Sequence, residues 1–244
     1  MKRKTFLFTF YSIIIIFIVF VFAFIFFGFK LETLKGNSKM QISTLTENLI
    51  PVIPLSQYPS LPTGCESTAA AMLLNYYKYN ISPEEFAEEI LIKEDFYYEN
   101  GFLCAPHPNY SFIGDPFSEN GYGCYAGAIV SSINQNIDNI TAVDISGKSL
   151  EEIKENYINC GIPVMIWATM SMTESKEGTS WYLENGELFT WISGEHCLVL
   201  IGYNDNFYFL NDPQLGYTVA YEKELVEKRF KELNSQAVYI CKNK

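Results

Sequence analysis

The chain opens with an almost unbroken apolar run, and its later hydrophobic residues fall in short segments separated by polar turns. The run extends from Phe6 to Phe29 and is interrupted only by two hydroxyl residues and one glycine. A helix of this length, rising about 1.5 Å per residue, spans a hydrocarbon core of roughly 30 Å. The run exceeds the roughly 7–15 apolar residues of a secretory signal, and no small-residue cleavage pattern follows it. We therefore expect an uncleaved transmembrane signal anchor.

Basic residues beside the apolar run set its expected orientation. Lys2, Arg3 and Lys4 precede the run, and an excess of Lys and Arg normally stays on the cytoplasmic side of a membrane. We therefore expect a single-pass protein of the cell membrane with its C-terminal part outside the cell. The chain then divides into a cytoplasmic tail at residues 1–4, the anchor at 5–29, a tether at 30–49 and one domain at 50–244.

Helix signals dominate the first half of the domain. A capping box, in which a Ser or Thr precedes a Glu by three residues, predicts three helix starts. These are Thr63 with Glu66, Ser82 with Glu85, and Ser149 with Glu152. The predicted helices extend to about residues 77, 92 and 160, and two others are predicted at 125–136 and 222–233.

Strand signals dominate the second half. Apolar segments predict strands at 143–145, 162–168, 181–183, 188–192, 197–203, 207–210 and 237–241. Asn185-Gly186 is typical of a tight hairpin turn between two of them. Residues 93–123 are rich in Gly, Pro and aromatics and read as a long irregular loop. Helices in one half and an antiparallel sheet in the other predict the α+β class.

The charge distribution excludes some classes of partner. The chain has 17 basic and 28 acidic residues, and residues 1–39 hold six of the basic and one of the acidic ones. The remainder therefore carries a net charge of −16. A domain with this charge is repelled by nucleic acid and by anionic lipid headgroups. We expect no nucleic-acid partner, and membrane contact only through the N-terminal helix; the sequence predicts no oligomeric state.

The cysteines do not form a metal-binding motif. Six of them occur at irregular spacing without a C-x-x-C pair, and the chain has only two histidines. The sequence therefore does not predict a structural zinc site, and we expect no cofactor. Cys104 and Cys124 flank a loop-like segment and could pair in an oxidising exterior. Cys160, Cys197 and Cys241 lie in or beside apolar stretches, which predicts buried thiols.

Cys65 is the candidate nucleophile. The Thr63 capping box places it in the first turn of an apolar helix, where free N–H groups and the helix dipole favour a thiolate and lower the thiol pKa. Gly64 before it leaves room for a substrate backbone. The alternative, a structural thiol at a helix start, has equal weight on this evidence, because free cysteines are often simply buried.

Two histidines are available as the base. His107 lies in the irregular loop, where no rigid element would orient it. His196 directly precedes a predicted strand, and Asp212 follows the next strand, where its carboxylate could orient the imidazole. Gln57, eight residues before the cysteine, could donate a side-chain N–H to an oxyanion.

The segment around the cysteine resembles the bacteriocin-processing cysteine peptidases, which cleave double-glycine leader peptides and form family thirty-nine of the cysteine peptidases. The resemblance covers about residues 51–241. It rests on LPTGCESTAAAM at 61–72, LNYY at 74–77, GYGCY at 121–125, GIPV at 161–164, GEH at 194–196, GY at 202–203 and NDP at 211–213. It implies a papain-like fold with Cys65 as nucleophile, His196 as base and acid, Asp212 as orienter and Gln57 in the oxyanion hole.

The expected function is therefore that of a membrane-anchored cysteine peptidase acting on a peptide or protein substrate. A catalytically silent module that binds cell-wall peptides or a protein, and an acyl transferase with the same residues, are the alternatives. Glu195 is expected to be an exposed turn residue, with a substrate-facing acid as the alternative reading. The aromatics of the irregular loop are expected to form a small satellite core, with the rim of a substrate cleft as the alternative.

Overall fold

The structure is a computed structural model that describes residues 49–243. The predicted tail, anchor and nearly all of the tether lie outside the described residues. Within residues 49–243, no helix is long and apolar enough to cross a membrane.

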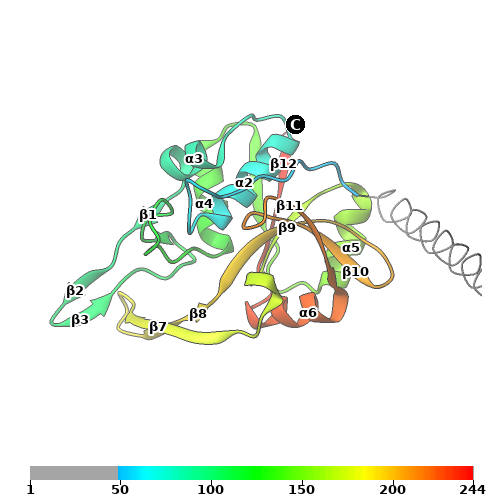
Figure 1. Ribbon diagram of the computed structural model, residues 1–244. Coiled ribbons are helices and arrows are strands. Elements are labelled where there is room, and N and C mark those ends of the chain that lie inside the picture. The colour runs from blue at the N-terminus through cyan, green and yellow to red at the C-terminus, as the bar shows by residue number, and fades with distance from the viewer. Residues whose placement is uncertain (1–48, 244) are drawn as a thin grey trace, which may run out of the picture. The chain divides into compact units, whose positions relative to one another are not determined.

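A six-stranded antiparallel sheet carries the strands that matter for the site (Figure 1). Its order is β11-β10-β9-β6-β12-β5. All six residues of β6 are buried, as are the first eight of the nine residues of β9, because both strands lie inside the sheet and are covered on both faces. The strands are β5 (Ile140–Asp144), β6 (Val164–Thr169), β9 (Glu195–Tyr203), β10 (Phe207–Asp212), β11 (Tyr217–Glu222) and β12 (Ala237–Lys242).

Helices cover the two faces of this sheet. The helix α2 packs on β9, and α6 packs on β6 and β10; Figure 1 shows α2 and α6 on opposite sides of β9. The helices are α2 (Cys65–Tyr76), α3 (Pro83–Glu85), α4 (Ala126–Asn136), α5 (Leu150–Asn156) and α6 (Lys223–Glu232). Short turns of other helical types are η1 (Phe86–Ile90), η2 (Ile158–Cys160) and η3 (Met170–Met172).

A smaller sheet extends beside the main one as a long arm (Figure 1). It consists of β2 (Tyr97–Glu99), β3 (Phe102–Cys104), β7 (Lys176–Tyr182) and β8 (Leu188–Ser193), in the order β2-β3-β7-β8. Two further short strands, β1 (Lys93–Glu94) and β4 (Phe112–Ile113), form a separate parallel pair; in the chain they flank β2 and β3. The segment 93–123, expected to be irregular, thus contains four short strands, which are too brief to show an alternating pattern in the sequence.

Most predicted elements are present, and the mixed helix and sheet class is confirmed. The capping boxes of Ser82 and Ser149 are both formed. Gly186, with a φ of +83°, makes the turn between β7 and β8 as its sequence predicts. The strand β11 was not predicted, because it lies at the edge of the sheet and is mostly half-buried or exposed.

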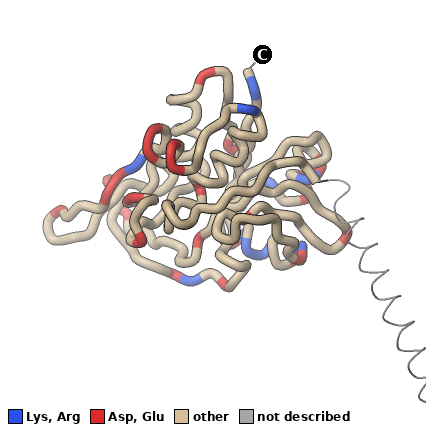
Figure 2. The backbone as a smooth tube through the Cα atoms, turned by 45° about the horizontal axis from the view of Figure 1, so that its top comes forward, with Lys and Arg blue, Asp and Glu red and all other residues tan. Residues whose placement is uncertain are grey.

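Acidic residues are distributed over the whole described domain, whereas Lys and Arg are few (Figure 2). The segment formed by α3 and η1 alone carries four glutamates, Glu84, Glu85, Glu88 and Glu89. No broad basic surface is therefore available on residues 49–243 for a phosphate backbone.

Candidate active site

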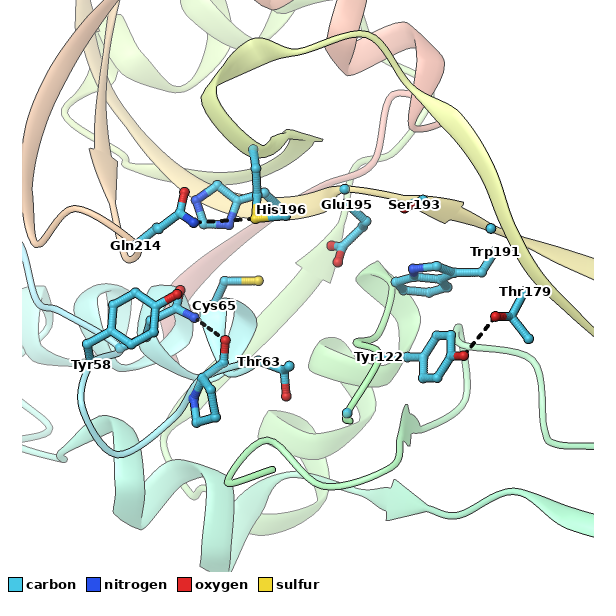
Figure 3. A pocket seen from close by; sticks show the side chains of 16 residues that line it. Tyr58, Thr63, Cys65, Tyr122, Thr179, Trp191, Ser193, Glu195, His196 and Gln214 are labelled. Atoms are coloured by element: carbon cyan, nitrogen blue, oxygen red, sulfur yellow. Dashed lines mark hydrogen bonds between the residues drawn. The ribbon is translucent and has the colours of Figure 1, made fainter. Parts of the chain in front are cut away.

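The structure brings the predicted site residues to one cleft of about 340 Å³ (Figure 3). Gln57, Cys65 and His196 line it, although they are separated by up to 139 residues in the chain. Asp212 lies behind His196 and is almost completely buried. The cleft thus lies between the start of α2 on one side and the strands β7, β8 and β9 on the other.

His196 and Asp212 form a hydrogen-bonded pair on neighbouring strands. Nε2 of His196 is 2.8 Å from Oδ1 of Asp212, and the backbone N–H of Gln214 donates to the same oxygen at 2.9 Å. Burial acts to raise the pKa of Asp212. The hydrogen bond from His196, the charge of that histidine, and the backbone N–H groups of Gln214 and Leu215 together outweigh burial and leave that pKa below its usual value. The carboxylate is therefore ionised, and it leaves Nδ1 of His196 as the nitrogen available for proton transfer.

Cys65 lies in the first turn of α2, as predicted, and is its first residue, but the predicted capping box is wrong. Gly64 is the N-cap, and no side chain caps the helix. The hydroxyl of Thr63 instead donates to backbone carbonyls more than fifty residues away, among them that of Ser118 at 3.0 Å.

The thiol of Cys65 is hydrogen-bonded to the side chain of the next residue, Glu66. Cys65 Sγ donates to Oε2 of Glu66 at 3.2 Å, and no hydrogen bond joins it to His196 within residues 49–243. Burial and then the nearby charges of Glu66 and Glu195 raise the pKa of Cys65 well above its usual value. The expectation of a thiolate stabilised by the helix start is therefore wrong for this conformation, since the carboxyl groups and burial oppose the helix dipole.

Two buried glutamates adjoin the candidate nucleophile and base: Glu66, expected only as a capping residue, and Glu195, expected in an exposed turn or facing substrate. Glu66 is fully buried and accepts a hydrogen bond from the backbone N–H of Cys124 at 2.6 Å. Burial raises the pKa of Glu66 to about 7, and burial together with the charge of Glu66 raises that of Glu195 well above its usual range. Glu195 is 7% exposed and lines the cleft, so the exposed-turn interpretation is wrong. Their positions directly after Cys65 and directly before His196 were the available signal.

Gly123 makes room for these carboxyl groups. A Cβ at this position would lie 2.5 Å from Oε1 of Glu66 and 2.9 Å from Oε2 of Glu195. Its φ of +153° also disfavours any other residue. The glycine in the GYGCY segment therefore leaves the space that these two acidic side chains occupy.

Gln57 lies in the cleft, but its amide donors are engaged. Nε2 donates to the carbonyl oxygens of Leu61 at 3.1 Å and of Pro62 at 2.9 Å. Two carbonyl acceptors fix the orientation of the amide, because only its nitrogen can donate to them. A role in an oxyanion hole therefore requires Nε2 to give up one of these bonds.

Aromatic side chains form the other end of the cleft (Figure 3). Tyr122 and Trp191 contact edge to face with ring centroids 6.0 Å apart, and the hydroxyl of Tyr122 donates to Thr179 at 2.8 Å. Phe96 from the expected irregular loop packs edge to face on Tyr122 and on Trp181. Phe96 is half-buried and Phe112 is buried, but most aromatics of that loop are exposed, so the satellite-core interpretation is wrong for most of the loop. The exposed ones are Tyr97, Tyr98, Phe102, Tyr110 and Phe117.

The six cysteines, all within the described residues, are free thiols. Cys104 and Cys124 are both buried and unbridged, and Cys197 is buried as expected. Cys160 is exposed, contrary to expectation, because it ends the short η2 turn at the surface. The other histidine, His107, packs against aromatic rings such as that of Phe189 at 4.8 Å, away from the cleft residues.

A family model decides the relationship of the chain to known proteins. The model of the Peptidase C39-like family matches residues 49–238. The chain belongs to this family. Its C39-like domain is 30% identical over 184 residues to the uncharacterized protein YvpB of Bacillus subtilis (strain 168), covering 75% of this chain and 71% of that protein.

A solved structure shares the C39-like fold. A crystal structure from Bacillus anthracis, described as that of a C39-like peptidase, superposes with a TM-score of 0.69 at 32% identity. The match covers 81% of this chain and 98% of the other. The family and this neighbour support a stand-alone papain-like domain of the cysteine-peptidase type.

Proposed function

We propose that this C39-like domain is a cysteine peptidase that hydrolyses peptide or isopeptide bonds, with Cys65 as nucleophile and His196 as general base and acid. The observation that supports it best is the 2.8 Å hydrogen bond between Nε2 of His196 and Oδ1 of the buried Asp212 behind it, since His196 and Cys65 line the same cleft. It fixes the ring so that Nδ1 is the nitrogen left for the thiol proton. Asp212 is a positioning residue in this proposal.

The first step moves the thiol proton. The side chain of Cys65 rotates away from Glu66, the S–H proton passes to Nδ1 of His196, and the sulfur attacks the carbonyl carbon of the substrate. Because burial and two carboxyl groups raise the pKa of the thiol, proton transfer accompanies the attack instead of preceding it. The backbone N–H of Cys65 is a donor for the resulting oxyanion, and Gln57 is a second donor once it releases a carbonyl.

The second step releases both products. The imidazolium of His196 protonates the leaving nitrogen as the carbon–nitrogen bond breaks, which leaves a thioester on Cys65. Water then attacks the thioester carbonyl and gives one proton to His196. Collapse of this intermediate releases the carboxylic acid, and the sulfur regains its proton as a thiol.

We further propose that the peptidase works outside the cell membrane on a peptide or protein substrate. The apolar run between Phe6 and Phe29, preceded by three basic residues, supports this location. The exposed Cys160 offers a direct test. A membrane-impermeant maleimide should label the full-length chain on intact cells, and Cys160→Ala should lose that label. Labelling only after the cells are broken would contradict an outward-facing domain.

A second candidate function is a catalytically silent module that binds peptides. Two observations favour it: the thiol of Cys65 is bonded to Glu66, and both amide donors of Gln57 are bonded to main-chain carbonyls. Each of these hydrogen-bonding arrangements has to change before catalysis. The silent module therefore predicts peptide binding without turnover.

The test compares hydrolysis and thiol labelling in matched variants of the full-length protein. Wild type should cleave members of a peptide library and react with a thiol-directed peptide inhibitor, and Cys65→Ala and His196→Ala should each lose turnover at least about 10³-fold. Cys160→Ala, which removes an exposed thiol that does not line the cleft, should retain full activity. Turnover in Cys65→Ala equal to wild type would rule out the proposal. Peptide binding by wild type without turnover would favour the silent module.

A further inference from the structure

Three potential metal ligands converge beside the candidate nucleophile. One ligand atom from each of Cys65, Glu66 and Glu195 lies within 4.8 Å of the others, and all three residues are buried. Within this group, Cys65 Sγ is 3.2 Å from Oε2 of Glu66. Figure 3 shows the Cys65 sulfur and the Glu195 carboxyl group directed toward the same part of the cleft. The start of α2 and the start of β9 bring these atoms together.

Among residues 49–243, no cationic side chain is paired with the carboxyl group of Glu66 or Glu195. The ion pairs within residues 49–243 join Lys154 to Glu151, His196 to Asp212 and Arg229 to Glu232, and none includes Glu66 or Glu195. Oε1 of Glu195 is buried and has no hydrogen-bond partner in the described part of the chain, and the residue is 93% buried. Buried carboxyl groups without a partner are costly, so this arrangement requires neutralisation by a proton or by a bound cation.

We propose that Cys65, Glu66 and Glu195 form a binding site for a divalent transition-metal ion, best matched by Zn²⁺, which occupies the nucleophile and blocks the peptidase. Zinc is bound by thiolate at about 2.3 Å and by carboxylate oxygen at about 2.0–2.2 Å, in a tetrahedron. Those bond lengths place sulfur and oxygen ligands about 3.5 Å apart. The observed 3.2 Å between Sγ and Oε2 is close to that value.

The ligand set selects the type of metal. A thiolate favours zinc and related transition metals over Mg²⁺ and Ca²⁺, which prefer oxygen ligands throughout. Three protein ligands leave the fourth tetrahedral position for water from the cleft, as in other open zinc sites. Binding displaces the thiol proton of Cys65 and any proton on the carboxyl groups to solvent, and no oxidation or reduction is involved.

Metal binding itself is independent of the proposed peptidase activity, whereas the inhibition rests on it. A block is expected because the sulfur cannot bind an ion and attack a carbonyl at the same time. Direct spectroscopy of the bound ion therefore separates failure of this inference from failure of the proposed function.

The experiment uses the full-length protein, stripped with a chelator and titrated with Co²⁺ as a spectroscopic substitute for Zn²⁺. Wild type should show a thiolate-to-cobalt charge-transfer band and intense visible bands of a four-coordinate ion, and Zn²⁺ should remove both by competition. Cys65→Ala should lose the charge-transfer band. Glu195→Gln should weaken binding at least about tenfold, and Glu66→Gln should act in the same direction.

Matched controls separate this site from its alternatives. Cys160→Ala and Glu184→Gln remove an exposed thiol and an exposed carboxylate and should leave the titration unchanged. His196→Asn should retain Co²⁺ binding, because the histidine is not a proposed ligand. Near-ultraviolet circular dichroism verifies the fold of each variant, and Glu195→Gln remains the deciding variant if Glu66→Gln does not fold.

Two results would overturn the proposal. An absence of the charge-transfer band in wild type would mean that shared protons alone neutralise the glutamates. Loss of binding in His196→Asn with retention in Glu195→Gln would place the ion on the cysteine and histidine instead.

Discussion

Oδ1 of Asp212 lies 2.8 Å from Nε2 of His196, and both side chains are almost completely excluded from solvent. The pair lies on adjacent antiparallel strands, β9 and β10, so its geometry is held by the sheet. Loop motion therefore has little influence on the orientation of the imidazole.

The first prediction concerns the orienting group. Asp212→Asn should keep turnover within about tenfold of wild type, because an amide oxygen still accepts a hydrogen bond from Nε2, as the asparagine of papain-like enzymes does. Asp212→Ala should lower kcat about 10²-fold or more, and it should lower the free energy of unfolding by about 1–3 kcal/mol by leaving a buried donor unpaired. Equal kcat values for the two variants would contradict an orienting role.

The second prediction concerns the free energy of unfolding at low pH. Because the pKa of Asp212 in the folded protein is below its usual value of 3.8, this residue stabilises the fold fully above that pH, and the stabilisation is lost as the pH falls through the lower folded value. Urea unfolding should give a difference in free energy between wild type and Asp212→Asn that is constant above about pH 5. The difference should shrink below pH 3.8. If the difference in unfolding free energy instead grew as the pH fell below 3.8, the pKa of Asp212 would not be lowered in the folded protein.

The third prediction concerns Gly123. Gly123→Ala should lower the free energy of unfolding by about 2–4 kcal/mol, since the new Cβ meets both buried carboxyl groups and the backbone is strained. Gly186→Ala is the matched control. Its φ is +83° and nothing lies within 4 Å of the added Cβ, so only the backbone strain of about 1–2 kcal/mol remains. Urea denaturation measures both, and similar losses would show that the carboxyl contact is unimportant.

The fourth prediction concerns the thiols. Native protein should react with an alkylating reagent first at Cys160, because the other five cysteines are buried or half-buried. Mass spectrometry after denaturation without a reductant should find six alkylated cysteines. Cys160→Ala should remove the fast reaction. Only four alkylated cysteines, with Cys104 and Cys124 unmodified and joined in a fragment two hydrogen atoms lighter than the two free thiols, would instead show that they are bridged.

Local signals predicted much of the fold correctly. The capping boxes at Ser82 and Ser149 are formed, because such boxes involve only residues three apart. The Thr63 box fails for the opposite reason. Its hydroxyl is bonded to carbonyls of residues 115–118, a contact that depends on how distant segments pack.

The sequence by itself determined which residues carry the candidate chemistry, because a cysteine at a helix start and a histidine at a strand start are local patterns. It also determined the family, which the comparison confirms. Only the tertiary structure decided the electrostatic surroundings of Cys65. Glu66 and Glu195 are 129 residues apart in the chain, and they meet only because α2 packs on β9. That packing removes water from both carboxyl groups, and burial together with their charges raises the pKa of the thiol that the helix start alone would have lowered.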